Sequence, residues 1–271
     1  MSKIKYVGLI LLIVFTFAYT DKVLSVINDN DSIMQEIRNI EEQYKIVPID
    51  ATIKDDSIIP GINGREIDIL ASYNNMKRSK VFNPTLLEYR TVFPENSIRN
   101  NMNKYIIHGN SNKNDVAIIY ILSSGSSNIL YNLDNGKIIN IFINCSFLEN
   151  NMKELSKFKN NEIYNYGDKG LYTNENIIIG NNIINNKTNN KSIYCLSIGK
   201  NSDTLDTCMN NKMWTIIPSI VGGYIDIKNS VKPGSIILLE NIKELNVVVN
   251  YLINKGYNIV SLSKLLSENI D

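Results

Sequence analysis

The chain has 271 residues, of which 44% are hydrophobic and 20% charged, with 28 basic and 27 acidic side chains. A formal net charge of +1 excludes the basic excess with which nucleic-acid-binding proteins contact phosphates, so we expect no nucleic-acid partner. The apolar content can fill a core, which excludes disorder over most of the chain. A single histidine, His108, and three cysteines exclude any mechanism that needs two imidazoles, and they give no zinc-finger spacing.

The N-terminal segment has the pattern of an export signal. Lys3 and Lys5 precede an apolar run from Tyr6 to Tyr19, and basic residues hold that end of such a segment in the cytoplasm. We expect residues 1–20 to be an uncleaved signal anchor; the alternatives are a signal peptide cut near Ala18 and a buried N-terminal helix. The expected location is therefore the extracytoplasmic face of a membrane, or outside the cell if the signal is cleaved.

Residues 21–57 are predicted to be a helical stalk and linker. Apolar residues recur at helical spacing over residues 22–45 with charged residues between them, and this pattern fits a stalk and a helix packed on a domain equally well. The segment Asp55–Arg65 contains the turn dipeptides Pro60-Gly61 and Asn63-Gly64. We expect this segment to be an ordered, turn-rich crossing without regular elements.

Short apolar runs alternate with helical patterns over residues 115–271. Runs of this kind suit strands that are buried on both faces of a parallel sheet. Helices are expected over Leu148–Leu155 and Lys243–Lys255, with Gly256 in the positive-φ position after the second and Ser261 as the N-cap of a last short helix. The chain is therefore predicted to be α/β, with an irregular (β/α) barrel of about seven parallel strands after the anchor, helix and extension. The seven predicted strands are Val116–Leu122, Ile138–Ile143, Ile177–Ile179, Ile193–Ser197, Trp214–Ile217, Ser235–Leu239 and Tyr257–Val260.

The same part of the chain resembles the polysaccharide deacetylase (NodB-homology) family. Val231–Glu240, with its Pro-Gly-Ser-Ile-Ile-Leu sequence, resembles a late strand of the family, and Leu252–Leu266 resembles its closing helix and strand. Ile139–Met152 resembles the strand and helix that follow the family's Asp-Asp pair, and Asn160–Gly167 resembles its histidine segment. The resemblance implies a deacetylase-like barrel over residues 115–271.

Residues 58–114 resemble the N-terminal extension of one Gram-positive branch of that family. The matching segments are Ile59–Asp68, Ser72–Lys77 and Lys104–Asn110. The last of them contains His108, which we expect to be a surface or turn histidine outside the barrel site.

The family's metal ligands have no counterparts in this sequence. The resemblance implies one Asp and a His-x-x-x-His pair on a divalent metal, a second Asp as base and a later His as acid. Placed residue by residue, the aspartates fall on Ile121 and Leu122, the histidine pair on Tyr166 and Gly170, and the acid on Glu240. Aliphatic side chains and glycine cannot bind a cation, so we expect no metal, no other cofactor and no catalytic residue.

The resemblance still places a relic cleft in the barrel. Its candidate residues are Leu122, Tyr166, Asp168 and Glu240, and Tyr166 together with Tyr172 could stack on a sugar ring. The arginine segment that orients the family's base falls on Tyr194-Cys195-Leu196.

An exported chain permits disulfides. Cys195 and Cys208 flank the polar stretch Gly199–Thr207, which could close as a loop, so a Cys195–Cys208 bridge and free thiols are both open. Cys145 lies in an apolar run and is expected to be a small buried hydrophobe.

The function predicted from these observations is that of a catalytically inactive, deacetylase-like protein of the cell envelope. Its expected partners are the membrane, through the N-terminal helix, and either peptidoglycan or another glycan, or a partner protein. Two alternatives are kept: a divergent, active carbohydrate N-deacetylase with a site rebuilt around Asp168 and Glu240, and a structural envelope protein.

Overall fold

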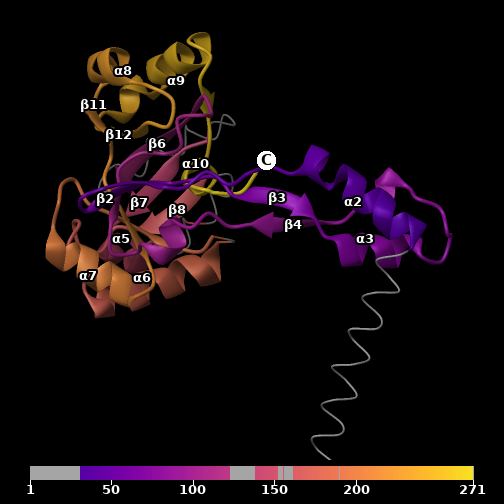
Figure 1. The fold of residues 1–271 in the computed structure, drawn as a ribbon. Helices are drawn as coiled ribbons and strands as arrows, with labels where there is room; N and C mark the ends of the chain where they lie inside the picture. The colour runs from indigo at the N-terminus through magenta and orange to yellow at the C-terminus, as the bar shows by residue number, and fades with distance from the viewer. Residues whose placement is uncertain (1–30, 123–137, 152–154, 156–160, 189, 271) are drawn as a thin grey trace, which may run out of the picture. The chain divides into compact units, whose positions relative to one another are not determined.

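The computed structural model of the chain describes residues 31–122, 138–151, 155, 161–188 and 190–270 (Figure 1). Its contacts define two units: unit 1 contains residues up to 48 and residues 63–93, and unit 2 contains residues 49–62 and 94–271. Residues 58–114, predicted as one extension, are thus shared between the units. The segment 1–20 lies outside the described ranges, within which no helix has the length and apolar character needed to span a bilayer.

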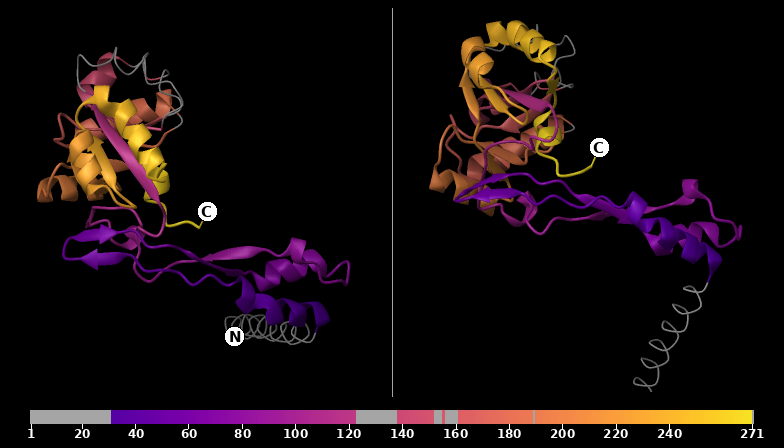
Figure 2. Two further views of the ribbon diagram at one scale, coloured as in Figure 1. Left: turned by 90° about the horizontal axis from the view of Figure 1, so that it is seen from above. Right: turned by 45° about the horizontal axis from the view of Figure 1, so that its top comes forward.

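Unit 1 packs two helices with an antiparallel strand pair. The side chain of Asp31 caps the first helix by accepting a hydrogen bond from Ile33 N at 2.9 Å. Ile33 and Ile37 of this helix are buried against Ile67 and Met76, so residues 32–44 form a packed helix rather than a stalk. The two helices lie side by side (Figures 1 and 2). The elements are α2 (Ser32–Tyr44), β3 (Gly64–Ile67), α3 (Ile69–Met76), the 3-10 helix η1 (Pro84–Leu86) and β4 (Tyr89–Val92).

The larger sheet of unit 2 is parallel throughout. Its strand order is β11-β12-β6-β7-β8, and β13 pairs with the start of β6. Side chains of β6 alternate between two buried clusters, because Val116 and Ile118 contact one core while Ala117 and Ile119 contact the other. This two-sided burial explains the continuous apolar run of the sequence. The strands are β6 (Asp115–Leu122), β7 (Asn140–Ile143), β8 (Glu162–Asn165), β11 (Ile220–Gly222), β12 (Ile236–Leu239) and β13 (Asn258–Ile259).

The second sheet of unit 2 has the order β1-β2-β5-β10-β9. Its first two strands form a hairpin through Asp55 and Asp56, with Asp55 at φ 54°, and the other pairs are parallel. The expectation of a crossing without elements over Asp55–Arg65 is therefore wrong, because β2 and the start of β3 lie within it. The strands are β1 (Thr52–Lys54), β2 (Ser57–Ile59), β5 (Tyr105–Ile106), β9 (Tyr194–Leu196) and β10 (Trp214–Ile216).

These sheets confirm an α/β fold with parallel strands, and six of the seven predicted strands form. Along the chain, β6 to β8 belong to the larger sheet, β9 and β10 to the second sheet, and β11 and β12 to the larger sheet again. In the described residues, hydrogen-bonded pairing between successive strands therefore breaks between β8 and β9 and between β10 and β11. Ile177–Ile179, predicted as a strand, lies in a helix, while β8 and β11 were absent from the predicted set.

Helices follow most strands of unit 2. The predicted helix near residues 243–255 is confirmed as α9, Gly256 has φ 82°, and the Ser261 side chain caps the next helix by accepting from Lys264 N at 3.3 Å. Figure 1 shows α8 and α9 side by side, and their Tyr224 and Tyr251 rings are 5.6 Å apart. The helices are η2 (Ile98–Asn100), α5 (Cys145–Asn150), α6 (Asn174–Lys187), α7 (Ser202–Asn210), α8 (Tyr224–Ser230), η5 (Ile242–Glu244), α9 (Leu245–Asn254) and α10 (Leu262–Leu265).

Candidate functional site

The positions of the expected relic cleft lie at the carboxyl ends of parallel strands. Leu122 is the last residue of β6, Tyr166 follows β8 and Glu240 follows β12. Because these strands belong to one parallel sheet, all three residues lie at the same edge of it. Glu240 is anchored through its backbone, since its N–H donates to the carbonyl oxygen of Gly222 at 3.2 Å.

The aromatic residues expected to line the cleft are part of the core instead. Leu122 is fully buried, and Tyr166 is only 7% exposed. Tyr172 is buried as well, and its hydroxyl oxygen accepts from Leu196 N at 2.9 Å while the O–H donates to Asn165 O at 3.3 Å. The expectation that Tyr166 and Tyr172 stack on a sugar is therefore wrong, because packing against neighbouring side chains covers both rings.

The backbone at the two histidine positions forms a tight turn. Asp168 N donates to Leu171 O at 2.9 Å, Gly170 N donates to Tyr166 O at 3.0 Å, and φ is positive at Gly167, Lys169 and Gly170. A Cβ atom added to Gly170 would lie 3.0 Å from the Tyr166 hydroxyl. Positions 166 and 170 are therefore adjacent, and the tyrosine fills the space between them.

The donor set at this edge does not fit a divalent metal. Leu122 and Gly170 have no donor atom, and burial raises the pKa of the Tyr166 phenol, which keeps it protonated and a poor ligand. Asp168 and Glu240 are exposed carboxylates. Within the described ranges, no three His, Cys, Asp or Glu side chains are grouped closely enough to hold a metal ion.

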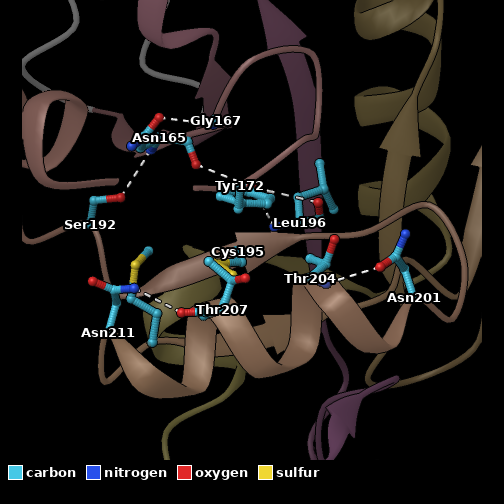
Figure 3. The surroundings of a disulfide bond; sticks show 12 residues. Asn165, Gly167, Tyr172, Ser192, Cys195, Leu196, Asn201, Thr204, Thr207 and Asn211 are labelled. Atoms are coloured by element: carbon cyan, nitrogen blue, oxygen red, sulfur yellow. Dashed lines mark hydrogen bonds between the residues drawn. A yellow bond between two sulfur atoms is a disulfide. The ribbon is translucent and has the colours of Figure 1, made fainter. Parts of the chain in front are cut away.

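A buried asparagine, Asn165, fixes the turn after β8. The side-chain oxygen of Asn165 accepts from Gly167 N at 2.9 Å (Figure 3). Its side-chain amide donates to Asn176 O at 2.8 Å. Its backbone N–H donates to the Ser192 hydroxyl at 2.9 Å. The side chain thus joins β8, the turn and α6. In the sequence, Asn165 lies within Asn160–Gly167, the segment that resembles the family's histidine segment.

Next to this turn, Cys195 of β9 and Cys208 of α7 form a disulfide (Figure 3). The two Cα atoms are 6.4 Å apart and both residues are fully buried, in a cluster with Tyr172, Ile177 and Met213. The segment in which the family carries its base-orienting arginine therefore joins β9 to α7 covalently. Cys145 is a buried free thiol whose pKa is raised by burial.

His108 is buried rather than at the surface, which corrects the sequence-based expectation. It is 6% exposed and follows β5, and its Nδ1 lies 2.8 Å from the carbonyl oxygen of Gly109. Because a carbonyl only accepts, Nδ1 carries the hydrogen and Nε2 is an acceptor in the neutral ring. Burial, together with the nearby charge of Lys232, lowers the pKa of His108.

This lowered pKa predicts a pH dependence of stability. Below the ordinary histidine pKa of about 6.5, His108 binds a proton in the unfolded chain but stays neutral in the folded chain. The free energy of unfolding should therefore fall by up to about 1.4 kcal/mol per pH unit on acidification. This contribution is complete above about pH 6.5 and is lost as the pH falls toward the lowered pKa. Urea unfolding at several pH values checks it. Because His108 is the only histidine, His108→Gln should remove this part of the slope, and identical slopes for both proteins would contradict the prediction.

Comparisons with known proteins identify the fold. No family model and no curated protein matches the sequence. A CE4 family pseudoenzyme from Bacillus anthracis superposes with a TM-score of 0.62 and 22% identity, covering 89% of this chain and 97% of that one. A mutant of that pseudoenzyme with restored enzymatic activity matches with a TM-score of 0.62 and 22% identity, covering 88% of this chain and 99% of that one. The Bc1960 peptidoglycan N-acetylglucosamine deacetylase matches with a TM-score of 0.50 and 16% identity, covering 61% of this chain and 95% of that one.

These likenesses are to solved structures that share 16–22% of their sequence with this chain. They confirm the resemblance to polysaccharide deacetylases at the level of the fold. The chain has the α/β fold of the CE4 deacetylases and of a pseudoenzyme that shares it.

Proposed function

We propose that this protein is a non-catalytic, deacetylase-like protein of the cell envelope that binds glycan at the carboxyl edge of its larger sheet. The observation that carries the proposal is the side-chain set at the ligand positions. Leu122, Tyr166 and Gly170 stand where an aspartate and two histidines would hold the metal, and two of the three are buried. The CE4 fold shared with a pseudoenzyme supports the same conclusion.

The glycan part of the proposal rests on the exposed residues at that edge. Asp168 and Glu240 are exposed carboxylates that can accept hydrogen bonds from sugar hydroxyls. Leu171, in the same turn as Asp168, is 68% exposed. An apolar side chain next to hydrogen-bond acceptors suits a sugar ring, which has apolar faces and polar edges. One solved structure with this fold is named as a peptidoglycan N-acetylglucosamine deacetylase, which makes N-acetylglucosamine polymers the first ligands to test.

The absence of deacetylase activity is directly measurable. Purified full-length protein incubated with N-acetylglucosamine oligomers should release no acetate above the no-protein control, because no residue at the site can hold or activate a hydrolytic water through a metal. Elemental analysis of the same preparation should find no stoichiometric divalent metal. Acetate release that a chelator abolishes would refute the proposal and favour the divergent hydrolase.

Binding is tested separately by co-sedimentation with insoluble peptidoglycan. The double variant Asp168→Ala, Glu240→Ala should bind at least several-fold more weakly, because it loses both exposed acceptors. Glu36→Ala, which removes an exposed acid from α2 of unit 1, is the matched control and should bind as the unchanged protein does. If the unchanged protein, the double variant and Glu36→Ala bind equally well, the carboxyl edge is not the glycan site.

We further propose that the protein is membrane-anchored on the extracytoplasmic face. The basic start and apolar run of residues 1–20 support an anchor, and the Cys195–Cys208 bridge suits an oxidising compartment. The full chain should sediment with membranes, whereas a chain without residues 1–20 should stay in the soluble fraction. A full-length product found in the cytosol would contradict this location.

A further inference from the structure

Unit 2 contains a cavity far from the carboxyl edge of the sheet. Its volume is 520 Å³, which is within the range of small-molecule sites. Its walls include Pro218, just before β11, and Lys232, between α8 and β12, as well as Ile107 and His108 after β5. It therefore opens at the amino ends of β11 and β12, whereas Gly222 and Glu240 lie at their carboxyl ends.

One buried polar atom of this cavity has no hydrogen-bond partner within the described residues. Only 6% of His108 is exposed, and its Nε2 atom has no hydrogen-bond partner in the part of the chain that the structure describes. Buried acceptors without a donor cost about 1–3 kcal/mol and are rare in native proteins. Ser111 and Ser230 also line the cavity, and Lys232 contributes a cation that forms no ion pair within the described ranges.

Part of the cavity wall is apolar and suits a hydrophobic surface of a ligand. Ile107 and Pro218 line the same cavity, so a ligand must offer a hydrophobic surface as well as polar groups. A pyranose ring does so, because its axial C–H groups form an apolar face while its hydroxyls point outward. An acidic substituent on such a ring could form an ion pair with the ammonium group of Lys232. A ring hydroxyl could donate a hydrogen bond to Nε2 of His108.

We propose that this cavity binds a monosaccharide-sized organic anion that carries hydroxyl groups, such as a sugar acid or a sugar phosphate. Lys232 contacts the acidic group, and Nε2 of His108 accepts a hydrogen bond from a hydroxyl. Gly234 supports this arrangement: with φ 88°, it has no side chain, and a Cβ atom there would lie 2.5 Å from His108 Nδ1. The Pro-Gly-Ser sequence of residues 233–235 thus makes room for the histidine that the site uses.

This site differs from the glycan-binding edge in place and in ligand. The edge carries exposed carboxylates, which repel anions, whereas the cavity carries an unpaired lysine and favours them. Loss of either binding activity in an experiment therefore leaves the other untouched.

The single histidine makes the test specific. In the full-length protein at about pH 7.5, the one imidazole Cε1–H signal in a carbon–proton NMR spectrum reports on His108 alone. Titration with glucuronate and with glucose 6-phosphate should shift this signal saturably with at least one of them, at concentrations up to about 10 mM. Glucose, which lacks the acid, should bind at least about tenfold more weakly, and the comparison of carboxylate with phosphate identifies the acidic group.

Two lysine variants complete the design. Lys232→Met should weaken binding about tenfold or more, because a charge-assisted contact is lost. Lys228→Met removes an exposed lysine of α8 that does not line the cavity, and it should leave binding unchanged. No shift with either anion, equal affinity for glucose, or unchanged binding by Lys232→Met would each overturn the proposal.

Discussion

Replacing Glu268 with alanine is expected to lower the free energy of unfolding by about 2–5 kcal/mol. Glu268 is buried, and its Oε1 accepts from two backbone N–H groups, Gly61 N at 3.0 Å and Ile98 N at 3.1 Å. Alanine removes the acceptor and leaves both donors buried without a partner. Urea unfolding followed by circular dichroism measures the change.

Glu268→Gln is the matched variant for this prediction. Glutamine keeps an Oε1 atom that can accept both hydrogen bonds, so it should recover more than half of the stability that alanine loses. If the glutamine and alanine variants unfold at the same denaturant concentration, acceptance by Oε1 is not the source of the stability.

Loss of the disulfide should have an effect of similar size. The double variant Cys195→Ala, Cys208→Ala should unfold with a free energy about 2–4 kcal/mol lower, because the bridge closes a loop with a sequence separation of 13 residues and restricts the unfolded chain. Both sulfur atoms also leave a buried cluster, which adds a packing loss. Denaturant unfolding with and without a reducing agent measures this contribution.

Two controls separate the bond from the packing. A reducing agent should destabilise the unchanged protein and leave the double variant unaffected. Cys145→Ala removes the buried free thiol and should cost only about 1 kcal/mol, with the sensitivity to reduction retained. Alkylation of three thiols in the native, unreduced protein would show that the bridge does not form.

The course of β6 and of α9 could be predicted from the sequence because each depends on a local pattern. A continuous apolar run gave the strand, and apolar residues on one face gave the helix. Ile177–Ile179 was assigned wrongly for an equally physical reason. Three β-branched residues favour a strand, but Thr173 and Asn176 form a reciprocal capping box just before them. Burial of Ile177, Gly180 and Ile184 on one helix face then outweighs the intrinsic preference.

The candidate site was predictable in its residue types but not in its packing. The resemblance places Leu122 and Gly170 at metal-ligand positions, and the prediction of no metal there needs only their chemistry, because neither side chain has a donor atom. Whether Tyr166 faces solvent depends on contacts between segments that are remote in sequence, and no local pattern reports them. The burial of His108 is another case, since it depends on Gly234, which is distant along the chain.

Because the two units alternate along the chain, a fragment that contains unit 2 alone cannot be made by a single cut. A fragment beginning at residue 115, where the deacetylase-like barrel was expected to start, would lack β1, β2 and β5. It would expose the edge of β10 that pairs with Tyr105 and Ile106, and an open strand edge invites pairing between molecules. Residues 49–62 therefore have to accompany residues 94–271 in any soluble fragment, with a short linker in place of unit 1.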